Sequence, residues 1–508
     1  MSNLSDLIPA GGGQNNTDFV ADGAIASGKP VILTAAGKAA EISETTVSPS
    51  MPLYSEQTFV SEAWQQPDIK ADPHNSNRWI MIWYHAAGTK HVHLKVITRS
   101  GTSWTSSSEL DGDVSGTTDK YPAVAWDKST ADKILITYNN SSSDGCCKVG
   151  TLSGSAGSES VSWGTELNFT TKNIRAGFRW NYPLICLDES GNFVVVYWEV
   201  GTTQLYGRVL QVDGTDVTAG GSDTTINSTG ISEIFDGSQV ADTTDRVLVA
   251  FRSSAGVNPT LVQELTISGT GITVGSEASG TTGTQSNGIN IIPVSSAKSV
   301  IITTSTPDKY PSYQIYTRSG TSFTTYTTCV SQAASYCGAT NNTGGDKLTF
   351  PVVFADNSDR NPFAITGTIN AGITSISFTA ATEINSTNNT AQYYLRNEQQ
   401  SDAEGHFVMM YEPSAFNIGY FWLGKTGGSS TNLTATNLLG IASAAISDTE
   451  TGTINTWGSR NEVQSSLTIA SDYYVQADGT ITTTSTSPAQ LIGQAISATQ
   501  INIKDYTG

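Results

Sequence analysis

A segment that recurs at a long interval is the feature that most restricts the fold of this 508-residue chain. TRSGTSWT at 98–105 returns as TRSGTSFT at 317–324, an offset of 219 residues. That offset is close to four units of about 55 residues. Weaker copies of the same turn place a glycine after an apolar run at intervals of 53, 60, 55, 51, 52 and 55 residues: Gly101, Gly154, Gly214, Gly269, Gly320, Gly372 and Gly427. The chain is therefore predicted to contain seven related units.

A second marker repeats in the same phase. Upstream of each glycine lies an apolar run typical of a buried strand, at 80–84, 134–138, 194–198, 247–251, 300–304, 348–354 and 407–411. A turn-forming residue, whose side chain can bond the backbone two residues further on, precedes each run: Asp72, Asp127, Asp188, Asp242, Ser295, Asn342 and Asn397. Each unit is thus predicted to hold four strands, with this turn after the first strand and the glycine turn before the last.

Four short antiparallel strands, repeated seven times at about 54 residues, predict an all-β fold, a seven-bladed β-propeller at 53–431. A row of separate β-sandwiches is the alternative, but each of those needs about 100 residues. The seventh unit lacks a good last strand, whereas SEQTFVSEAW at 55–64 lies unused before the first unit. We expect this segment to complete the last blade, so that loss of residues 53–64 lowers thermal stability sharply.

The segments outside the propeller have hairpin patterns of their own. Residues 28–42 alternate around Ala36–Gly37, and residues 471–481 turn at Asp478–Gly479, a strong hairpin dipeptide. Because ring closure brings the two ends of the propeller together, we expect one small β domain built from 17–52 and 432–508. The propeller is inserted into this domain, and residues 1–16 form an anchoring tail.

Composition agrees with strands and turns, and it excludes several functions. Lys and Arg number 26 against 45 Asp and Glu, a net charge of −19, which argues against nucleic-acid binding because phosphate contacts need a basic footprint. No signal peptide and no apolar run long enough for a membrane span are visible. Cys329 and Cys337 could meet across a turn, but free buried thiols are the favoured interpretation for all five cysteines: Cys146, Cys147, Cys186, Cys329 and Cys337.

The terminal segments resemble terminal modules of virion appendage proteins from tailed, notably marine, bacteriophages. The matching stretches are FVADGAIASGKPVILTAAGKAAEI at 19–42, NLLGIASAAISDTETGTI at 437–454 and LTIASDYYVQADGTITTTSTSPAQLIGQAISATQINI at 467–503. The resemblance implies a tail-fibre, spike or surface-fibre protein, made in the host cytoplasm and located in the virion. It also implies contact with other virion structural proteins and with a host cell-surface glycan or receptor, and homo-oligomerisation. No enzyme family resembles the propeller closely.

Few residues of the sequence are candidates for catalysis or for metal binding. His91 and His93 share one strand face by the two-residue period, and with His85 they could converge on a metal ion. Surface histidines on a polar strand are commoner, so neither a metal nor another cofactor is expected. The recurring aspartates are assigned to turns, and the sequence has no sialidase Asp-box, GxSxG, HExxH or P-loop motif. The chain is therefore predicted not to be an enzyme.

The loop TKNIRAGFRWNYP at 171–183 is the strongest candidate for binding a ligand. In an acidic chain it gathers three cations and three aromatic rings: Lys172, Arg175, Phe178, Arg179, Trp180 and Tyr182. Aromatic rings stack on sugar faces and guanidinium groups grip carboxylates, so the expected target is an acidic surface glycan. The competing interpretation is that the rings pack between blades while the cations pair with nearby acids.

The expected function is thus a phage fibre or surface appendage that anchors through its terminal domain and presents a propeller for host attachment. One alternative is a carbohydrate-active, depolymerase-type enzyme. The other is a purely structural capsid or tail decoration or adaptor protein.

Overall fold

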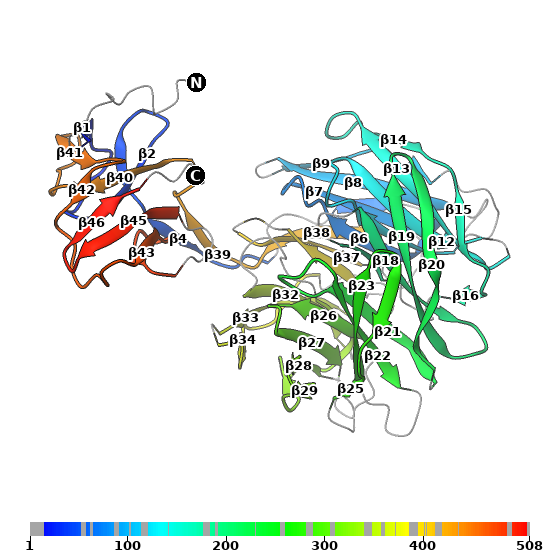
Figure 1. Cartoon of the computed structure of the whole chain (residues 1–508). Coiled ribbons are helices and arrows are strands. Elements are labelled where there is room, and N and C mark those ends of the chain that lie inside the picture. The colour runs from blue at the N-terminus through cyan, green and yellow to red at the C-terminus, as the bar shows by residue number, and fades with distance from the viewer. Residues whose placement is uncertain are drawn as a thin grey trace. The chain divides into compact units, whose positions relative to one another are not determined.

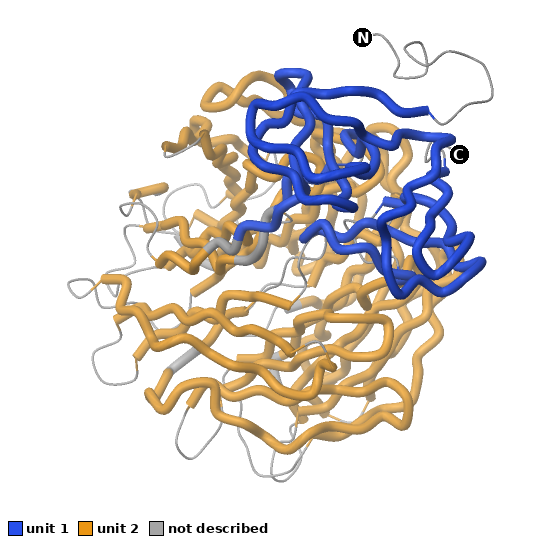
Figure 2. The backbone as a smooth tube through the Cα atoms, turned by 90° about the vertical axis from the view of Figure 1, so that its left-hand side faces the viewer, with its two compact units in different colours: residues 1–47, 429–508 blue, residues 48–428 orange. Residues whose placement is uncertain are grey.

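The computed structural model describes residues 15–51, 57–60, 64–85, 91–100, 103–112, 120–140, 142–175, 183–187, 191–228, 230–253, 260–280, 288–304, 310–339, 348–356, 361–370, 372–385, 395–400, 402, 404–411, 419–434, 436–484 and 490–504. Every long regular element in these ranges is a β-strand, and they contain no helix that could cross a membrane. The chain separates into a terminal unit, residues 1–47 with 429–508, and a central unit, residues 48–428 (Figure 2). The sequence places these divisions a few residues later, at 52/53 and 431/432.

The described residues of the central unit form seven antiparallel sheets that follow one another along the chain (Figure 1). The first sheet comprises β6 (Trp64–Ala71), β7 (Arg78–His85), β8 (Val92–Ser100), β9 (Ser103–Ser106) and β10 (Leu110–Asp111). The second comprises β11 (Lys120–Trp126), β12 (Lys133–Asn139), β13 (Gly145–Ser153), β14 (Ser160–Trp163) and β15 (Leu167–Thr170). The third comprises β16 (Ile174–Arg175), β17 (Leu184–Cys186), β18 (Asn192–Glu199), β19 (Gln204–Asp213) and β20 (Asp216–Asn227).

The next three sheets repeat the same plan. The fourth comprises β21 (Ile231–Gln239), β22 (Arg246–Ser253), β23 (Thr260–Ser268), β24 (Gly271–Val274) and β25 (Ala278–Ser279). The fifth comprises β26 (Ile289–Pro293), β27 (Lys298–Thr304), β28 (Pro311–Thr317), β29 (Ser322–Phe323) and β30 (Thr327–Thr328). The sixth comprises β31 (Ala334–Ala339), β32 (Thr349–Asp356), β33 (Pro362–Ile369), β34 (Ile376–Phe378) and β35 (Thr382–Glu383). Most sheets divide their outer edge between two short strands, which the sequence does not predict.

The seventh sheet takes its outer strand from the start of the unit. It comprises β36 (Arg396–Gln399), β37 (His406–Tyr411), β38 (Gly419–Lys425) and β5 (Gln57–Val60). Strand β5 pairs with β38, with Val60 opposite Gly419 and Gln57 opposite Phe421. The expectation that the segment before the first unit completes the last sheet is therefore confirmed for residues 57–60.

The innermost strands link the sheets into a closed series. In chain order, β6 contacts β11, β11 contacts β17, β17 contacts β21, β21 contacts β26, β26 contacts β31 and β31 contacts β36. Strand β36 then contacts β6 again. Because the series returns to its first member, the innermost strands surround a common axis.

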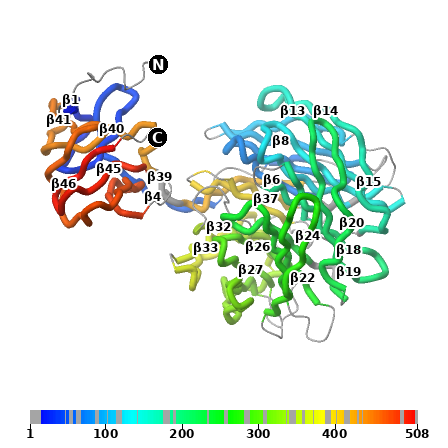
Figure 3. Tube along the Cα trace, viewed as in Figure 1, coloured from blue at the N-terminus to red at the C-terminus, as the bar shows by residue number. Residues whose placement is uncertain are grey.

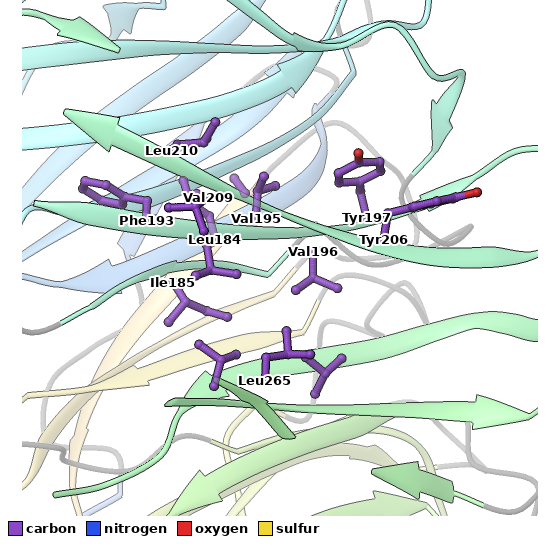
Figure 4. Close-up of a cluster of buried hydrophobic side chains, with 14 of the residues drawn as sticks. Leu184, Ile185, Phe193, Val195, Val196, Tyr197, Tyr206, Val209, Leu210 and Leu265 are labelled. Atoms are coloured by element: carbon purple, nitrogen blue, oxygen red, sulfur yellow. The ribbon is translucent and has the colours of Figure 1, made fainter. Parts of the chain in front are cut away.

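Apolar second strands form the cores between sheets. Strands β7, β12 and β18 each bury nearly all of their central residues. Six of the seven apolar runs recognised in the sequence lie within second strands, and the run at 348–354 begins one residue before β32. Figure 4 shows the core around the third sheet, where Val196 of β18 points toward Leu265 of β23. Each sheet buries both faces, so these runs are continuously apolar rather than alternating.

The turns after the first strands match the sequence prediction in part. Oδ1 of Asp72 accepts the N–H of His74 at 2.8 Å, and Oδ1 of Asp127 accepts that of Ser129 at 2.8 Å. Oγ of Ser295 likewise accepts the N–H of Ala297, two residues further on, at 3.3 Å. Asp188 and Asn342 lie outside the described residues. The prediction for Asn397 is wrong.

Asn397 lies inside β36, opposite Met409, and its side-chain amide donates to the carbonyl of Pro351. The turn comes later, where Oδ1 of Asp402 accepts the N–H of His406 at 2.9 Å. The error arises because β36 is a polar strand, RNEQ, which has none of the apolar character expected of a buried strand.

Strands from both chain ends build the terminal unit, so blue traces lie among orange and red traces in Figure 3. One sheet has the order β1 (Asn16–Val20), β41 (Thr451–Asn455), β40 (Leu438–Ala442), β2 (Pro30–Leu33) and β3 (Ala39–Glu41). Another has the order β42 (Arg460–Asn461), β46 (Gln500–Ile503), β45 (Gln490–Ser497), β43 (Asp472–Val475) and β44 (Ile481–Thr482). Strands β4 (Glu44–Val47) and β39 (Gly428–Thr431) pair separately.

The core of the terminal unit joins its two larger sheets. Ile32 and Ile441 of the first sheet pack with Tyr473 and Val475 of the second. The two expected hairpins are present as β2–β3 and β43–β44. The cysteine prediction for the central unit is also confirmed, since all five cysteines are buried and none forms a disulfide.

Candidate functional site

The candidate loop at 171–183 contains the short strand β16 and ends just before β17. Within it, Arg175 of β16 lies opposite Trp198 of β18. Directly after it, Leu184 of β17 lies opposite Val195 of the same strand. The chain on both sides of residues 176–182 is thus paired with β18. The side chain of Arg175 and the whole of residues 176–182, which include Phe178, Arg179, Trp180 and Tyr182, lie outside the described part.

Lys172, at the start of this loop, has two partners. Its Nζ lies 3.2 Å from Oε2 of Glu199 and 4.1 Å from the centre of the Tyr206 ring. Burial alone would lower the pKa of Lys172, but hydrogen bonding to Glu199 and Tyr206 outweighs it and raises that pKa. The ammonium therefore stays charged and held in place, and for Lys172 the competing interpretation of a cation paired with a nearby acid is correct.

A row of aromatic rings supports this cation. The Tyr206 ring stacks on the Tyr197 ring, with 5.9 Å between ring centres; both side chains are labelled in Figure 4. Tyr197 also meets Phe169 of β15 edge-on at 5.7 Å. All three side chains are buried, so none offers a free face to a sugar. The cluster can position Lys172 and the Glu199 carboxylate as polar contacts beside the loop, and stacking on a ligand is left to the loop itself.

The three candidate metal-binding histidines take other contacts. Nδ1 of His93 lies 2.7 Å from Oε1 of Glu109, and the His93 ring stacks on Trp83. The hydrogen bond from His93 lowers the pKa of Glu109. His85 and His91 lie edge-on to His93, at 5.5 and 6.5 Å between ring centres. Within the described ranges no group of three His, Cys, Asp or Glu residues is arranged to hold a metal ion.

A cluster of charges at the axis is absent from the sequence predictions. Nζ of Lys70 on β6 lies 3.6 Å from Oδ1 of Asp68 and 3.9 Å from Oε2 of Glu398 on β36. Asp236 of β21 and Arg396 of β36 lie within electrostatic reach of the same ammonium. Burial raises the pKa of Glu398 to about 7, although Lys70 acts against this rise. Burial would lower the pKa of Lys70, but its carboxylate neighbours raise it.

Two of these carboxylates also link neighbouring sheets. Oδ2 of Asp68 accepts the N–H of Val124 on β11 at 3.2 Å, and Oδ2 of Asp236 accepts the N–H of Ile291 on β26 at 2.8 Å. Both aspartates occupy the same place in their units. Each lies four residues before the residue, Asp72 or Val240, whose backbone N–H bonds across the turn after the first strand. This recurrence is the signal that sequence comparison between units could have found.

Comparison with known proteins bears on the fold alone. No family model and no curated protein matches the chain. The BP39L lectin from Burkholderia pseudomallei is 8% identical, with a TM-score of 0.51 over 75% of this chain and 100% of that chain. A six-bladed β-propeller lectin from Aleuria aurantia is 13% identical, with a TM-score of 0.38 over 62% and 98%. The β-propeller domain of the trilobed protease from Pyrococcus furiosus is 9% identical, with a TM-score of 0.39 over 77% and 99%. The chain is all-β, and its structural neighbours are β-propellers.

Proposed function

We propose that the chain is a non-enzymatic appendage protein of a phage particle. Its seven sheets are the blades of one propeller that binds acidic glycans of the host surface, and its terminal unit attaches the propeller to the virion. The closed contact series and the pairing of β5 with β38 support the seven-bladed ring. Partners are other virion proteins and the host glycan.

The proposal that the terminal unit attaches the chain to the virion rests on where apolar side chains are exposed. All large hydrophobic residues that are exposed in the described part belong to the terminal unit: Val20, Trp457, Val463, Ile469 and Ile496. The central unit, although three times larger, has no such residue in its described ranges. Exposed apolar groups mark surfaces for protein contact, so the terminal unit is the part that binds the particle or further copies of this chain.

The glycan-binding part of the proposal rests on the third sheet and the loop next to it. Lys172 in the loop and Glu199 beside it hold fixed polar groups, and the backbone of Arg175, also in the loop, is paired with β18. Guanidinium groups bind carboxylates in a bidentate manner, so Arg175 and Arg179 suit a carboxylated sugar. Propeller lectins occur among the structural neighbours, which agrees with such a role for this fold.

The test is an array of neutral and acidic glycans probed with the full-length protein. Binding to acidic glycans should fall at least about tenfold in an Arg175→Ala, Arg179→Ala double variant, since two charge-assisted contacts are lost. Arg246→Ala is the matched control, because Arg246 is half-exposed on the fourth sheet and pairs with Glu264. Undiminished binding by the double variant would remove the loop from the site.

The same glycan experiment distinguishes the proposed function from the two alternatives, an enzyme and a structural protein. New reducing ends or unsaturated sugars would identify a depolymerase-type enzyme. Absence of binding to all glycans and to host cells would leave a structural decoration or adaptor protein. The proposal predicts binding without product.

A further inference from the structure

One face of the third sheet has a polar pair of side chains at its end and an aromatic pair behind it. In the pairing of β18 with β19, Glu199 lies opposite Gln204 and Tyr197 lies opposite Tyr206. Residues opposite each other in an antiparallel pair share a face of the sheet, and so do residues two apart on one strand. The two tyrosines are buried, so the polar groups of this face lie at the end that Glu199 and Gln204 occupy.

The candidate loop brings an ammonium group to this polar end, and its backbone is fixed there. Nζ of Lys172 lies 3.2 Å from Oε2 and 3.3 Å from Oε1 of Glu199. The N–H of Val200 donates to the carbonyl of Asn173 at 2.8 Å, and Ile174 pairs with Glu199 in the sheet. The two charged groups are therefore held relative to each other before a ligand arrives, which reduces the cost of binding one.

The pairing of Lys172 with Glu199 decides what the ammonium can bind. Together the two groups carry no net charge. A ligand carboxylate that approaches the ammonium also meets the Glu199 carboxylate, so attraction and repulsion largely cancel. A hydroxyl group meets no such conflict, because it accepts from an ammonium and donates to a carboxylate. The pair thus favours neutral hydroxyl groups over acid groups.

Both members of the pair have capacity left for a ligand. The side chains of Lys172 and Glu199 are 26% and 17% exposed. A carboxylate has about four acceptor sites. Within the described residues, Lys172 occupies one site on each oxygen of Glu199 and Thr202 occupies a second site on Oε2. A second site on Oε1 is thus left for a ligand hydroxyl, beside the ammonium.

We propose that Lys172 and Glu199 form a subsite for two adjacent hydroxyl groups of a neutral sugar. One hydroxyl accepts a hydrogen bond from the ammonium, and its neighbour donates one to the carboxylate. Adjacent hydroxyls on a sugar ring are close to hydrogen-bond distance from each other, so they match a donor and an acceptor held 3.2 Å apart. This inference rests on the proposed function and narrows it: the host glycan combines an acidic sugar with a neutral sugar that has a free vicinal diol.

A panel of disaccharides, each made of one uronic acid and one neutral hexose, tests the subsite. Every disaccharide is prepared twice, with two adjacent hexose hydroxyls either free or as methyl ethers, and titration calorimetry measures its binding to the full-length protein. The free diol should raise affinity by about tenfold or more, since hydrogen bonds to charged groups are lost in the ethers. In Lys172→Met and in Glu199→Gln this preference should fall to about twofold or less. Methionine keeps an unbranched side chain over the Tyr206 ring.

A second lysine–glutamate pair provides the matched control. Nζ of Lys425 lies 3.0 Å from Oε2 of Glu404 on the seventh sheet, and Lys425→Met should keep the preference for the free diol. A preference that persists in both Lys172→Met and Glu199→Gln would overturn the subsite. So would a Lys172→Met variant that weakens the free and the etherified forms by the same factor, because Lys172 would then bind the carboxylate.

The unmodified protein separates this inference from the proposed function without any variant. Equal binding of the free and etherified forms would overturn the diol subsite and leave an acidic glycan as the ligand. Failure to bind any uronic-acid disaccharide would overturn the subsite and the proposed glycan binding together. Binding that requires both the uronic acid and the free diol is the expected result.

Discussion

The surroundings of Glu398 at the axis raise the pKa of its carboxyl group. Its side chain is 19% exposed and lies near one cation, Lys70, and near Asp68 and Asp236. Burial and the two like charges outweigh the cation, which is why its pKa is about 7 rather than the ordinary 4.5. The folded protein keeps this proton over a pH range in which the unfolded chain has released it.

Glu398 should therefore make stability fall as pH rises from about 4.5 to about 7. The shift from 4.5 to about 7 corresponds to at most about 3 kcal/mol of unfolding free energy. In Glu398→Gln this contribution disappears, so the loss of stability between about pH 5 and about pH 8 should be smaller than in the unmodified protein. Thermal unfolding at the two pH values measures it, with exposed Glu450→Gln as control. Parallel pH profiles for the variant and the unmodified protein would contradict the shift.

Two hairpin glycines of the terminal unit differ in surroundings but not in backbone angle. Gly37 has φ +75 with open space around a Cβ, whereas Gly479 has φ +76 and a Cβ there would lie 2.7 Å from the carbonyl oxygen of Ile42. Gly37→Ala should cost about 1 kcal/mol of unfolding free energy through the backbone alone. Gly479→Ala should cost at least about 2 kcal/mol because the clash adds to it. Equal losses in chemical denaturation would show that the close approach to Ile42 is absent.

At the scale of elements, β5 is the strand on which ring closure depends. It is short, yet Phe59 is 3% exposed and meets Trp83 at 5.6 Å and Phe421 at 6.3 Å. One ring thus packs against the first and seventh sheets together. The strand contributes to the ring mainly through this packing, because its backbone pairing with β38 is irregular between Gly419 and Tyr420.

Phe59→Ala should lower the unfolding free energy by about 3 to 5 kcal/mol, the cost of removing a buried ring. Thr58→Ala changes the exposed neighbour on the same strand and should stay within about 0.5 kcal/mol. Thermal unfolding of both variants decides between a closure strand and a surface attachment. If Phe59→Ala unfolds at the same temperature as Thr58→Ala, β5 does not close the ring.

The strands also show which parts of the fold sequence patterns could predict. Second strands such as β18 were predictable because burial on both faces requires an unbroken apolar run. First strands such as β36 were not, because charges at the axis give them a polar sequence. At the candidate site the sequence identified Lys172 but not its partner Glu199, which lies 27 residues away along the chain.

At the scale of the whole molecule, the two units differ in what they expose. The central unit buries its apolar residues within and between sheets, while the terminal unit leaves large apolar side chains in solvent. Ile469 is 63% exposed and Ile496 is 45% exposed. The backbone bond from Ala470 to Ala495 brings their two segments together. This part of the terminal unit is the proposed contact with other virion proteins.

Ile469→Ser combined with Ile496→Ser should reduce incorporation of the chain into particles. Stability should change by no more than about 0.5 kcal/mol per site, because both side chains are already solvated. Asp245→Ser, a change on the surface of the central unit, serves as control and should leave incorporation unchanged. Quantifying the protein in purified particles gives the result. Normal incorporation of the double variant would place the attachment surface elsewhere.

Labelling of intact particles with two antibodies tests most directly whether this chain is a virion appendage held by its terminal unit. The particles are those of the phage proposed as the source of the chain, and the antibodies are raised separately against the central and terminal units. We expect the antibody to the central unit to label intact particles, and the antibody to the terminal unit to label them only after disruption. Unlabelled particles, or the reverse pattern, would contradict it.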